Sequence, residues 1–220
     1  MSNRLALFDC DGTLVDSQAN ICLSMEEAFL LAGLEAPSRD AIRRIIGLSV
    51  VEAVAALSPQ LDDARHRALA EDYKSAFFRL RASGAMDEEP LFDGMIEALD
   101  TLAEAGWLFG VATGKSDRGL ARILAHHGIA DRFVTLQTAD RHRSKPHPSM
   151  IELAMAEAGA APDTTVMIGD TSYDMMMARA AGAHALGVAW GYHPPHELTA
   201  AGAHAIAETV AGMPVWMESL

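Results

Sequence analysis

Hydrophobic residues occur along this chain in short runs, and a stretch with helical spacing follows most of them. The runs with β character predict strands at Leu5–Phe8, Trp107–Ala112, Phe133–Leu136, Val166–Ile168, Ala185–Val188 and Ala205–Ala207. The stretches between them predict helices at Ser116–His127, Ser149–Ala158 and Tyr173–Ala181. Because strands that alternate with helices usually pair in parallel, this pattern predicts an α/β fold with a doubly wound parallel sheet and helices on both faces.

A different pattern interrupts this alternation between about Asp16 and Ala85. Here the apolar positions have helical spacing throughout, and they predict helices at Asn20–Ala32, Ser38–Ile46, Ser49–Ala56 and Leu61–Arg81. A helical block directly after the first strand is typical of an inserted cap. We therefore expect a Rossmann-like core made of residues 1–15 and 86–220, and an α-helical cap domain made of residues 16–85.

The composition indicates a globular protein and narrows the classes of partner. Of the 220 residues, 50% are hydrophobic, and 17 Lys and Arg stand against 30 Asp and Glu, which gives a formal net charge of -13. Such an acidic chain is not expected to bind nucleic acid or an anionic membrane surface. Cys10 and Cys22 fit neither a disulfide framework nor a metal-ligand spacing. Because we see no apolar run of membrane-spanning length and no signal-peptide pattern, we expect a cytoplasmic protein. We also expect it to be a monomer or a homodimer.

Two acids at the end of the first predicted strand carry the clearest chemical signal. Asp9 and Asp11 begin on the same side of the chain, because side chains alternate along a strand. Two carboxylates this close repel each other unless a cation or a shared proton relieves them. The pair therefore indicates a bound metal ion, a division of work between a nucleophile and an acid, or both.

Later predicted strands also end in functional groups. Thr113 ends the second strand, Lys145 follows the third, and Asp170 and Asp174 follow the fourth. Ligands of open parallel sheets bind outside the carboxyl ends of the strands. We therefore expect a hydroxyl, an ammonium and two pairs of acids to converge at one edge of the sheet.

Taken in order, these groups resemble the motifs of the haloacid dehalogenase superfamily, in its phosphatase branch. The first motif is similar to the run from Phe8 to Ser17, the second to Thr113, the third to Lys145, and the fourth to Gly169-Asp170 with Asp174. The resemblance covers nearly the whole chain and points most closely to phosphoglycolate-phosphatase-like proteins. It implies an Mg²⁺-dependent phosphatase whose partner is a small phosphorylated metabolite, either phosphoglycolate-like or a sugar phosphate.

The resemblance also implies roles for the four matched acids. Asp9 is expected to attack phosphorus and form an aspartyl-phosphate, whereas Asp11 is expected to protonate the leaving group and later to activate water. The carboxylates of Asp9 and Asp170 and the backbone carbonyl of Asp11 are expected to bind Mg²⁺. Asp174 is expected to orient the site from outside the metal's own ligands.

Three further matched residues are expected to hold the phosphoryl oxygens through the Thr113 hydroxyl, the Gly114 amide and the Lys145 ammonium. Gly114 departs from the family pattern, which often has Asn at this position. Only a backbone donor is therefore available there, which affects the fine geometry of the phosphate pocket rather than the reaction class.

The predicted cap offers candidates for substrate recognition in the segment Arg43-Arg44-Ile45-Ile46-Gly47, which resembles the cap loop that reaches over the catalytic acids in related enzymes. Gly47 would allow a close approach of the backbone. Arg43 or Arg44 would pair with a second anionic group on the substrate, although a solvated helix face is an equally good interpretation of both arginines.

Alternative functions remain open at this point. A sugar-phosphate mutase or an inorganic or organic pyrophosphatase would use the same core. Dehalogenase chemistry is disfavoured by the presence of Asp11, and phosphonatase chemistry by the lack of a cap lysine other than Lys74. A phosphoryl-accepting signalling or binding module is disfavoured as well, because its accepting Asp would follow the third strand, which here ends in Leu136-Gln137-Thr138.

Overall fold

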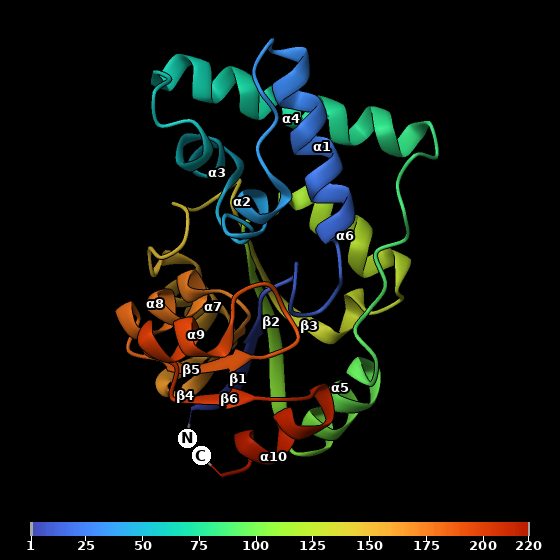
Figure 1. The fold of residues 1–220 in the computed structure, drawn as a ribbon. Coiled ribbons are helices and arrows are strands. Elements are labelled where there is room, and N and C mark those ends of the chain that lie inside the picture. Colours follow the sequence, from blue (N-terminus) through green and yellow to red (C-terminus); the bar gives the residue numbers. More distant parts are fainter. Residues whose placement is uncertain (1, 220) are drawn as a thin grey trace.

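The structure is a computed structural model that describes residues 2–219. Within these residues, one six-stranded sheet lies at the centre of the fold (Figure 1). Its strands are β1 (Asn3–Phe8), β2 (Trp107–Thr113), β3 (Phe133–Thr138), β4 (Ala160–Gly169), β5 (His184–Val188) and β6 (Ala205–Ala207). They lie in the order β3-β2-β1-β4-β5-β6, and every neighbouring pair is parallel. The predicted α/β fold class is therefore confirmed.

Helices cover both faces of this sheet. The first face packs against α5 (Met95–Glu104), α6 (Asp117–His126) and α10 (Met213–Met217), and the second against α7 (Ser149–Ala158), α8 (Ser172–Ala180) and α9 (Pro195–Ala200). Two short 3-10 turns, Ala130–Arg132 and Val210–Gly212, complete the core.

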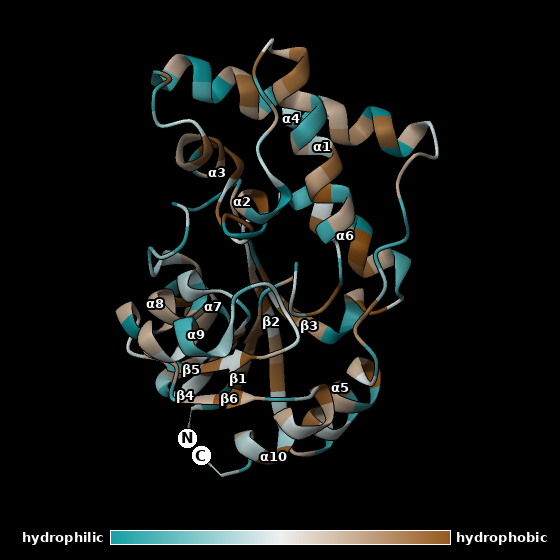
Figure 2. Ribbon diagram, viewed as in Figure 1, coloured by the Kyte–Doolittle hydropathy of each residue, from teal (hydrophilic) through white to brown (hydrophobic). Residues whose placement is uncertain are grey.

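The central strand β1 supplies apolar side chains to both layers. Ala6 and Phe8 belong to the apolar cluster on the side of α5 and α6, whereas Leu5 and Leu7 belong to the cluster on the side of α7 and α8. All four side chains are fully buried. A run without polar alternation is what a parallel strand covered on both faces requires, and the strands of the sheet are accordingly largely apolar in Figure 2.

Four helices lie apart from the sheet, above the carboxyl ends of its strands (Figure 1). They are α1 (Gln18–Leu31), α2 (Arg39–Arg43), α3 (Val50–Leu57) and α4 (Asp63–Ala82), and we call them the cap helices. They pack around an apolar cluster of their own, to which each contributes: Ile21 and Met25 from α1, Ile42 from α2, Val54 from α3 and Leu69 from α4. A separate cluster gives these helices a means of holding together independently of the sheet.

Glu89, in the linker between α4 and α5, ties the cap helices to the core. Arg81 of α4 and Arg122 of α6 each donate a hydrogen bond to its Oε2, at 2.7 and 2.8 Å. Burial alone would raise the pKa of the Glu89 carboxyl, but the positive charges of Lys115, Arg122 and Arg81 outweigh it and lower that pKa below its usual range. The Glu89 carboxylate is therefore ionised, and it lies between Arg81 of the cap helices and Arg122 of the core.

The predicted elements differ from the observed ones mainly at the ends and in α5. Helix α5 was not predicted, although its buried residues Met95, Ala98, Leu99 and Leu102 have helical spacing. The short helices α9 and α10 were not predicted either. Strands β3 and β4 extend beyond their apolar runs, because polar residues such as Gln137 and Thr165 are buried there and form hydrogen bonds. In the described part of the chain, no helix is long and apolar enough to cross a membrane.

Candidate active site

Asp9 lies directly beyond β1, where the neighbouring strand β4 fixes its backbone. Its amide donates a hydrogen bond to the Ile168 carbonyl at 2.9 Å, and its side chain is fully buried. One carboxylate oxygen, Oδ1, accepts a hydrogen bond from the Cys10 amide at 2.6 Å. The other, Oδ2, lies 2.9 Å from the Lys145 ammonium but has no hydrogen bond of good geometry with any described residue. A buried carboxylate oxygen is thus left for a further ligand.

Lys145 bridges two acids that come from different strand ends. Its Nζ lies 2.9 Å from Asp9 Oδ2 and donates a hydrogen bond to Asp174 Oδ1 at 2.6 Å, and all three side chains are almost completely inaccessible to solvent. The other oxygen of Asp174 accepts hydrogen bonds from the Thr171 amide and hydroxyl, which also caps helix α8. Asp174 therefore fixes both the lysine and the first turn of α8.

Asp170 is held by two loops. Its Oδ1 accepts a hydrogen bond from the Thr13 hydroxyl and its Oδ2 one from the Tyr192 amide, each at 2.9 Å. Gly12 and Gly191 pack so closely on this carboxylate that a Cβ at either position would collide with it. Sequence reasoning missed the loop that contains Tyr192, because it bears none of the matched motifs.

Three carboxylates, from Asp9, Asp170 and Asp174, form one buried group in which an oxygen of each lies within 4.8 Å of the others. Burial raises the pKa of Asp9 to about 7 against the opposing effect of Lys145, and burial also raises the pKa of Asp170 well above its usual range. Burial alone would lower the pKa of Lys145, but Asp174 and Asp9 outweigh it and raise that pKa. With all three acids ionised, one ammonium leaves two negative charges without a counter-charge.

This donor set fits a divalent cation that prefers oxygen ligands, such as Mg²⁺. The group offers only carboxylate oxygens, one of which lacks a hydrogen-bond partner, and with all three acids ionised its excess charge equals that of one such ion. Asp11 contributes no side-chain oxygen to this group. Its predicted part in metal binding concerned the backbone carbonyl and stays a prediction.

Asp11 lies in a different environment, facing Lys115. The ammonium of Lys115 lies 2.8 Å from Asp11 Oδ1, and the Ser17 hydroxyl donates a hydrogen bond to the same oxygen. Because both contacts go to Oδ1, Oδ2 of Asp11 has no partner in either of them. From the sequence, no role was assigned to Lys115, and this contact was therefore missed. The signal was present, since Lys115 follows the same strand end.

Thr113 and Gly114 lie where β2 ends, on the strand beside β1. Thr113 is fully buried, and its hydroxyl accepts a hydrogen bond from the Lys115 amide. At Gly114, a Cβ would lie 2.5 Å from the Leu48 carbonyl oxygen and 2.7 Å from that of Gly47. The glycine that departs from the family pattern therefore makes room for the cap loop, and Gly47, with a φ of +100°, supplies the backbone shape that this loop needs.

The two arginines predicted to bind substrate are placed elsewhere. Arg43 pairs with Asp40 at 2.7 Å, one turn earlier in its own helix, and Arg44 pairs with Glu197 of α9 at 3.2 Å. Neither residue lines the cavity described below. These ion pairs favour the alternative interpretation, in which both arginines have structural roles, and their part in substrate binding stays a prediction.

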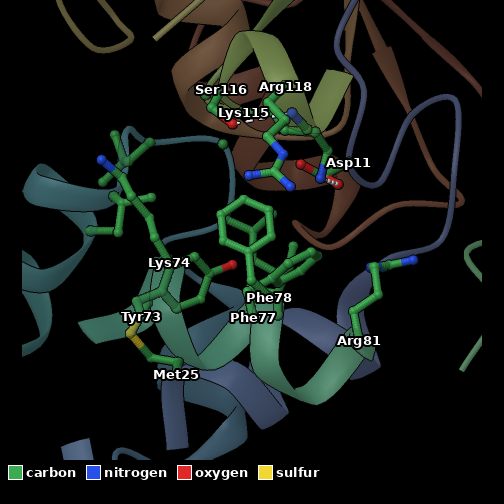
Figure 3. Close-up of a pocket in the computed structure, with 18 of the residues that line it drawn as sticks. Asp11, Met25, Tyr73, Lys74, Phe77, Phe78, Arg81, Lys115, Ser116 and Arg118 are labelled. Carbon is green, nitrogen blue, oxygen red and sulfur yellow. Dashed lines mark hydrogen bonds and ion pairs between the residues drawn. The ribbon is translucent and has the colours of Figure 1, made fainter. Parts of the chain in front are cut away.

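A cavity of about 640 Å³ lies between the cap helices and the core. Asp11, Gly114 and Lys115 line its core side, and Phe77 and Phe78 of α4 line its cap side. Figure 3 shows the side chain of Arg118 between these two sides. The structure thus brings Asp9, Asp170, Asp174 and Lys145 together in one buried group, with Asp11 between that group and a cavity.

Comparison with known proteins agrees with this geometry. A family model described as haloacid dehalogenase-like hydrolase matches residues 6–188. The chain is 35% identical over 209 residues to a protein named "probable phosphatase IndB" from Dickeya dadantii. This match covers 93% of this chain and 89% of that protein. It is 30% identical over 190 residues to a phosphoglycolate phosphatase from Xanthomonas campestris pv. campestris, and that match covers 86% of this chain and 84% of that protein.

A solved structure is similar in fold as well. The crystal structure of a predicted phosphatase from Clostridium acetobutylicum superposes with a TM-score of 0.88 and covers 100% of each chain, at 24% identity. This likeness concerns the fold, including the cap helices.

The contact between Gly114 and the cap loop gives a prediction about stability. Gly114→Ala is expected to lower the free energy of unfolding by about 1–3 kcal/mol, because the added methyl group meets backbone carbonyls that cannot rotate away. Urea unfolding measures the difference. Gly212→Ala is the control, since a Cβ there has only one neighbour, at 3.3 Å. Equal stability of both variants would show that the loop does not lie against Gly114 in solution.

Proposed function

Because the chain belongs to the haloacid dehalogenase-like hydrolase family and is a phosphatase, we propose that it hydrolyses a small phosphomonoester through an aspartyl-phosphate on Asp9, with Mg²⁺ bound beside it. The observation that supports this most directly is Oδ2 of Asp9, which pairs with Lys145 but has no hydrogen bond of good geometry and lies buried among three carboxylates. The relatives named phosphoglycolate phosphatase make phosphoglycolate and similar small phosphorylated metabolites, including sugar phosphates, candidate substrates.

The proposed metal ligands are the carboxylates of Asp9 and Asp170 and the backbone carbonyl of Asp11. When bound, Mg²⁺ would offset negative charge on the phosphoryl group and on the two carboxylates. Asp174 is proposed to act through its neighbours, because its oxygens are already engaged by Lys145 and Thr171. It keeps the lysine in place between the two acids.

Asp9 is proposed as the nucleophile. A carboxylate oxygen of Asp9 forms a bond to phosphorus as the bond from phosphorus to the ester oxygen breaks, which yields the aspartyl-phosphate and an alcohol. Its buried, fixed position is what an in-line attack needs, because the attacking oxygen has little freedom to lose. A water molecule then attacks the phosphorus of the intermediate as the bond from phosphorus to the Asp9 oxygen breaks, which releases inorganic phosphate and restores the carboxylate.

Asp11 is proposed as the group that moves the proton. It donates a proton to the departing ester oxygen and later accepts one from the attacking water. The contacts with Lys115 and Ser17 both go to Oδ1, so Oδ2 is available to carry this proton. Asp11 also lines the cavity, which puts the leaving alcohol on the cavity side.

Three groups are proposed to hold the phosphoryl oxygens: the Thr113 hydroxyl, the Gly114 amide and the Lys145 ammonium. Fixed donors of this kind stabilise charge on the transferring group without reorganising. We further propose that residues 16–85 act as a cap and residues 1–15 and 86–220 as a catalytic core, with the segment at Gly47 closing over the site.

The nucleophile is tested by Asp9→Asn. Release of inorganic phosphate from p-nitrophenyl phosphate is expected to fall by at least about a thousandfold, because an amide cannot form the covalent intermediate. Asp163→Asn changes an exposed acid near the start of β4, at the end of the strand away from Asp170, and as the matched control it should keep full activity. If Asp9→Asn kept the wild-type turnover, Asp9 would not be the nucleophile.

The proton transfer is tested by Asp11→Asn. Its kcat is expected to fall at least about tenfold more for an alkyl phosphate than for p-nitrophenyl phosphate, because the nitrophenolate leaves without help from an acid. Steady-state kinetics with the two esters give this ratio. Equal losses for both esters would contradict a general-acid role.

The metal is tested by chelation and by Asp170→Asn. Thorough treatment with EDTA is expected to abolish phosphate release, and added Mg²⁺ to restore it. Asp170→Asn should need at least about tenfold more Mg²⁺ for half-maximal activity, because it removes one charged ligand. Activity that survives chelation would exclude the metal site, and Asp163→Asn again serves as the control.

A further inference from the structure

The cavity between cap and core is larger and more apolar than a two-carbon ester requires. Its volume of about 640 Å³ lies within the range of sites that enclose ligands of drug size. Hydrophobic side chains from three cap helices line it, among them Met25 of α1, Val50 of α3 and Phe77 and Phe78 of α4. Asp11, Lys115 and Ser116 lie at the core end, whereas the cap end combines these hydrophobic side chains with Tyr73, Lys74 and Arg81 of α4.

Cationic side chains also line the cavity, and most of them are neutralised. Four of the five are paired with carboxylates of the described residues: Lys115 with Asp11, Arg81 and Arg122 with Glu89, and Lys74 with Glu71. The fifth, Arg118, has no carboxylate within ion-pair distance among residues 2–219. Its guanidinium carbon lies 4.2 Å from the centre of the Phe78 ring.

Phe77 and Phe78 are therefore arranged as an aromatic wall opposite the proton donor. Their ring centres are 6.4 Å apart, and the rings are nearly perpendicular. Phe78 is 40% exposed, although it is a large apolar residue, and it faces the cavity (Figure 3). The Arg118 guanidinium lies over the exposed Phe78 ring and has no carboxylate partner among the described residues. This arrangement is a suitable surface for a flat ring, because guanidinium and phenyl groups both stack on aromatic faces.

We propose that the substrate is a phosphomonoester whose alcohol carries a flat apolar or aromatic ring, and that Phe77, Phe78 and Arg118 bind this ring. The proposal rests on the proposed function, because it places the ester oxygen next to Asp11 and lets the alcohol extend into the cavity. A two-carbon carboxylated ester would leave the aromatic wall without contact. A sugar could meet polar side chains of the lining, but it would bring hydroxyl groups against Phe77 and Phe78, which offer them no partners.

The test compares esters that have the same leaving-group chemistry. Naphthylmethyl phosphate and benzyl phosphate carry a ring on a methylene group, whereas ethyl phosphate and phosphoglycolate have no ring. All four release a primary alcohol, so intrinsic reactivity differs little among them. The value of kcat/KM for naphthylmethyl phosphate is expected to exceed that for ethyl phosphate or phosphoglycolate by about tenfold or more.

Two variants assign the preference to the aromatic wall. In Phe78→Ala, the ratio of kcat/KM for naphthylmethyl phosphate to that for ethyl phosphate is expected to fall about tenfold. Phe77→Leu removes a ring but keeps an apolar side chain, so that α4 stays packed. In this variant the ratio of the two kcat/KM values should fall as well. Leu31→Ala removes an exposed apolar side chain from cap helix α1, outside the cavity, and should leave the ratio unchanged.

The possible failures are distinguishable. If ethyl phosphate or phosphoglycolate is hydrolysed as efficiently as the ring-bearing esters, the proposed substrate class is wrong while the phosphatase mechanism stands. An unchanged ratio in both phenylalanine variants would also overturn the proposed ring site. If no phosphate is released from any ester, p-nitrophenyl phosphate included, the proposed function fails and this inference fails with it.

Discussion

The excess of negative charge around Lys145 is the constraint on which the rest of the site depends. One ammonium lies between Asp9 and Asp174, Asp170 adds a third buried carboxylate, and no water-exposed surface screens them. Such a group is costly unless each oxygen has a partner. The surrounding loops provide these partners through Thr13, Thr171 and the Tyr192 amide, and one oxygen of Asp9 is left for a ligand from outside the chain.

Close packing around these acids explains why small residues surround them. At Gly12, Gly169 and Gly191, a Cβ would collide with a carboxylate of the acidic group. Gly114 has the corresponding role toward the cap, where backbone carbonyls occupy the space that a side chain would need. The backbone therefore encloses the acids directly and keeps bulk solvent away, which strengthens every electrostatic contact inside.

Much of the fold could be predicted because its signals are local. Apolar runs mark buried parallel strands, and the carboxyl ends of parallel strands meet at one edge, so Asp9, Lys145 and Asp170 could be expected together. Contacts across the fold could not be predicted in this way. Arg44 meets Glu197, which is 153 positions away, and Lys115 meets Asp11 from another strand. Helical spacing located α4, yet only the packing of the cap decides that its aromatic residues face the cavity.

The position of β1 at the centre of the sheet also bears on how the chain is made. Its partners β2 and β4 begin at Trp107 and Ala160, so β1 with its apolar segment Leu5–Phe8 leaves the ribosome long before either of them. At ordinary rates of synthesis this interval is on the order of ten seconds. During that time the strand has two unpaired edges, which favour aggregation. Asp9 is therefore made well before the two strands that fix its backbone, and its working position depends on pairings across more than 90 residues of chain.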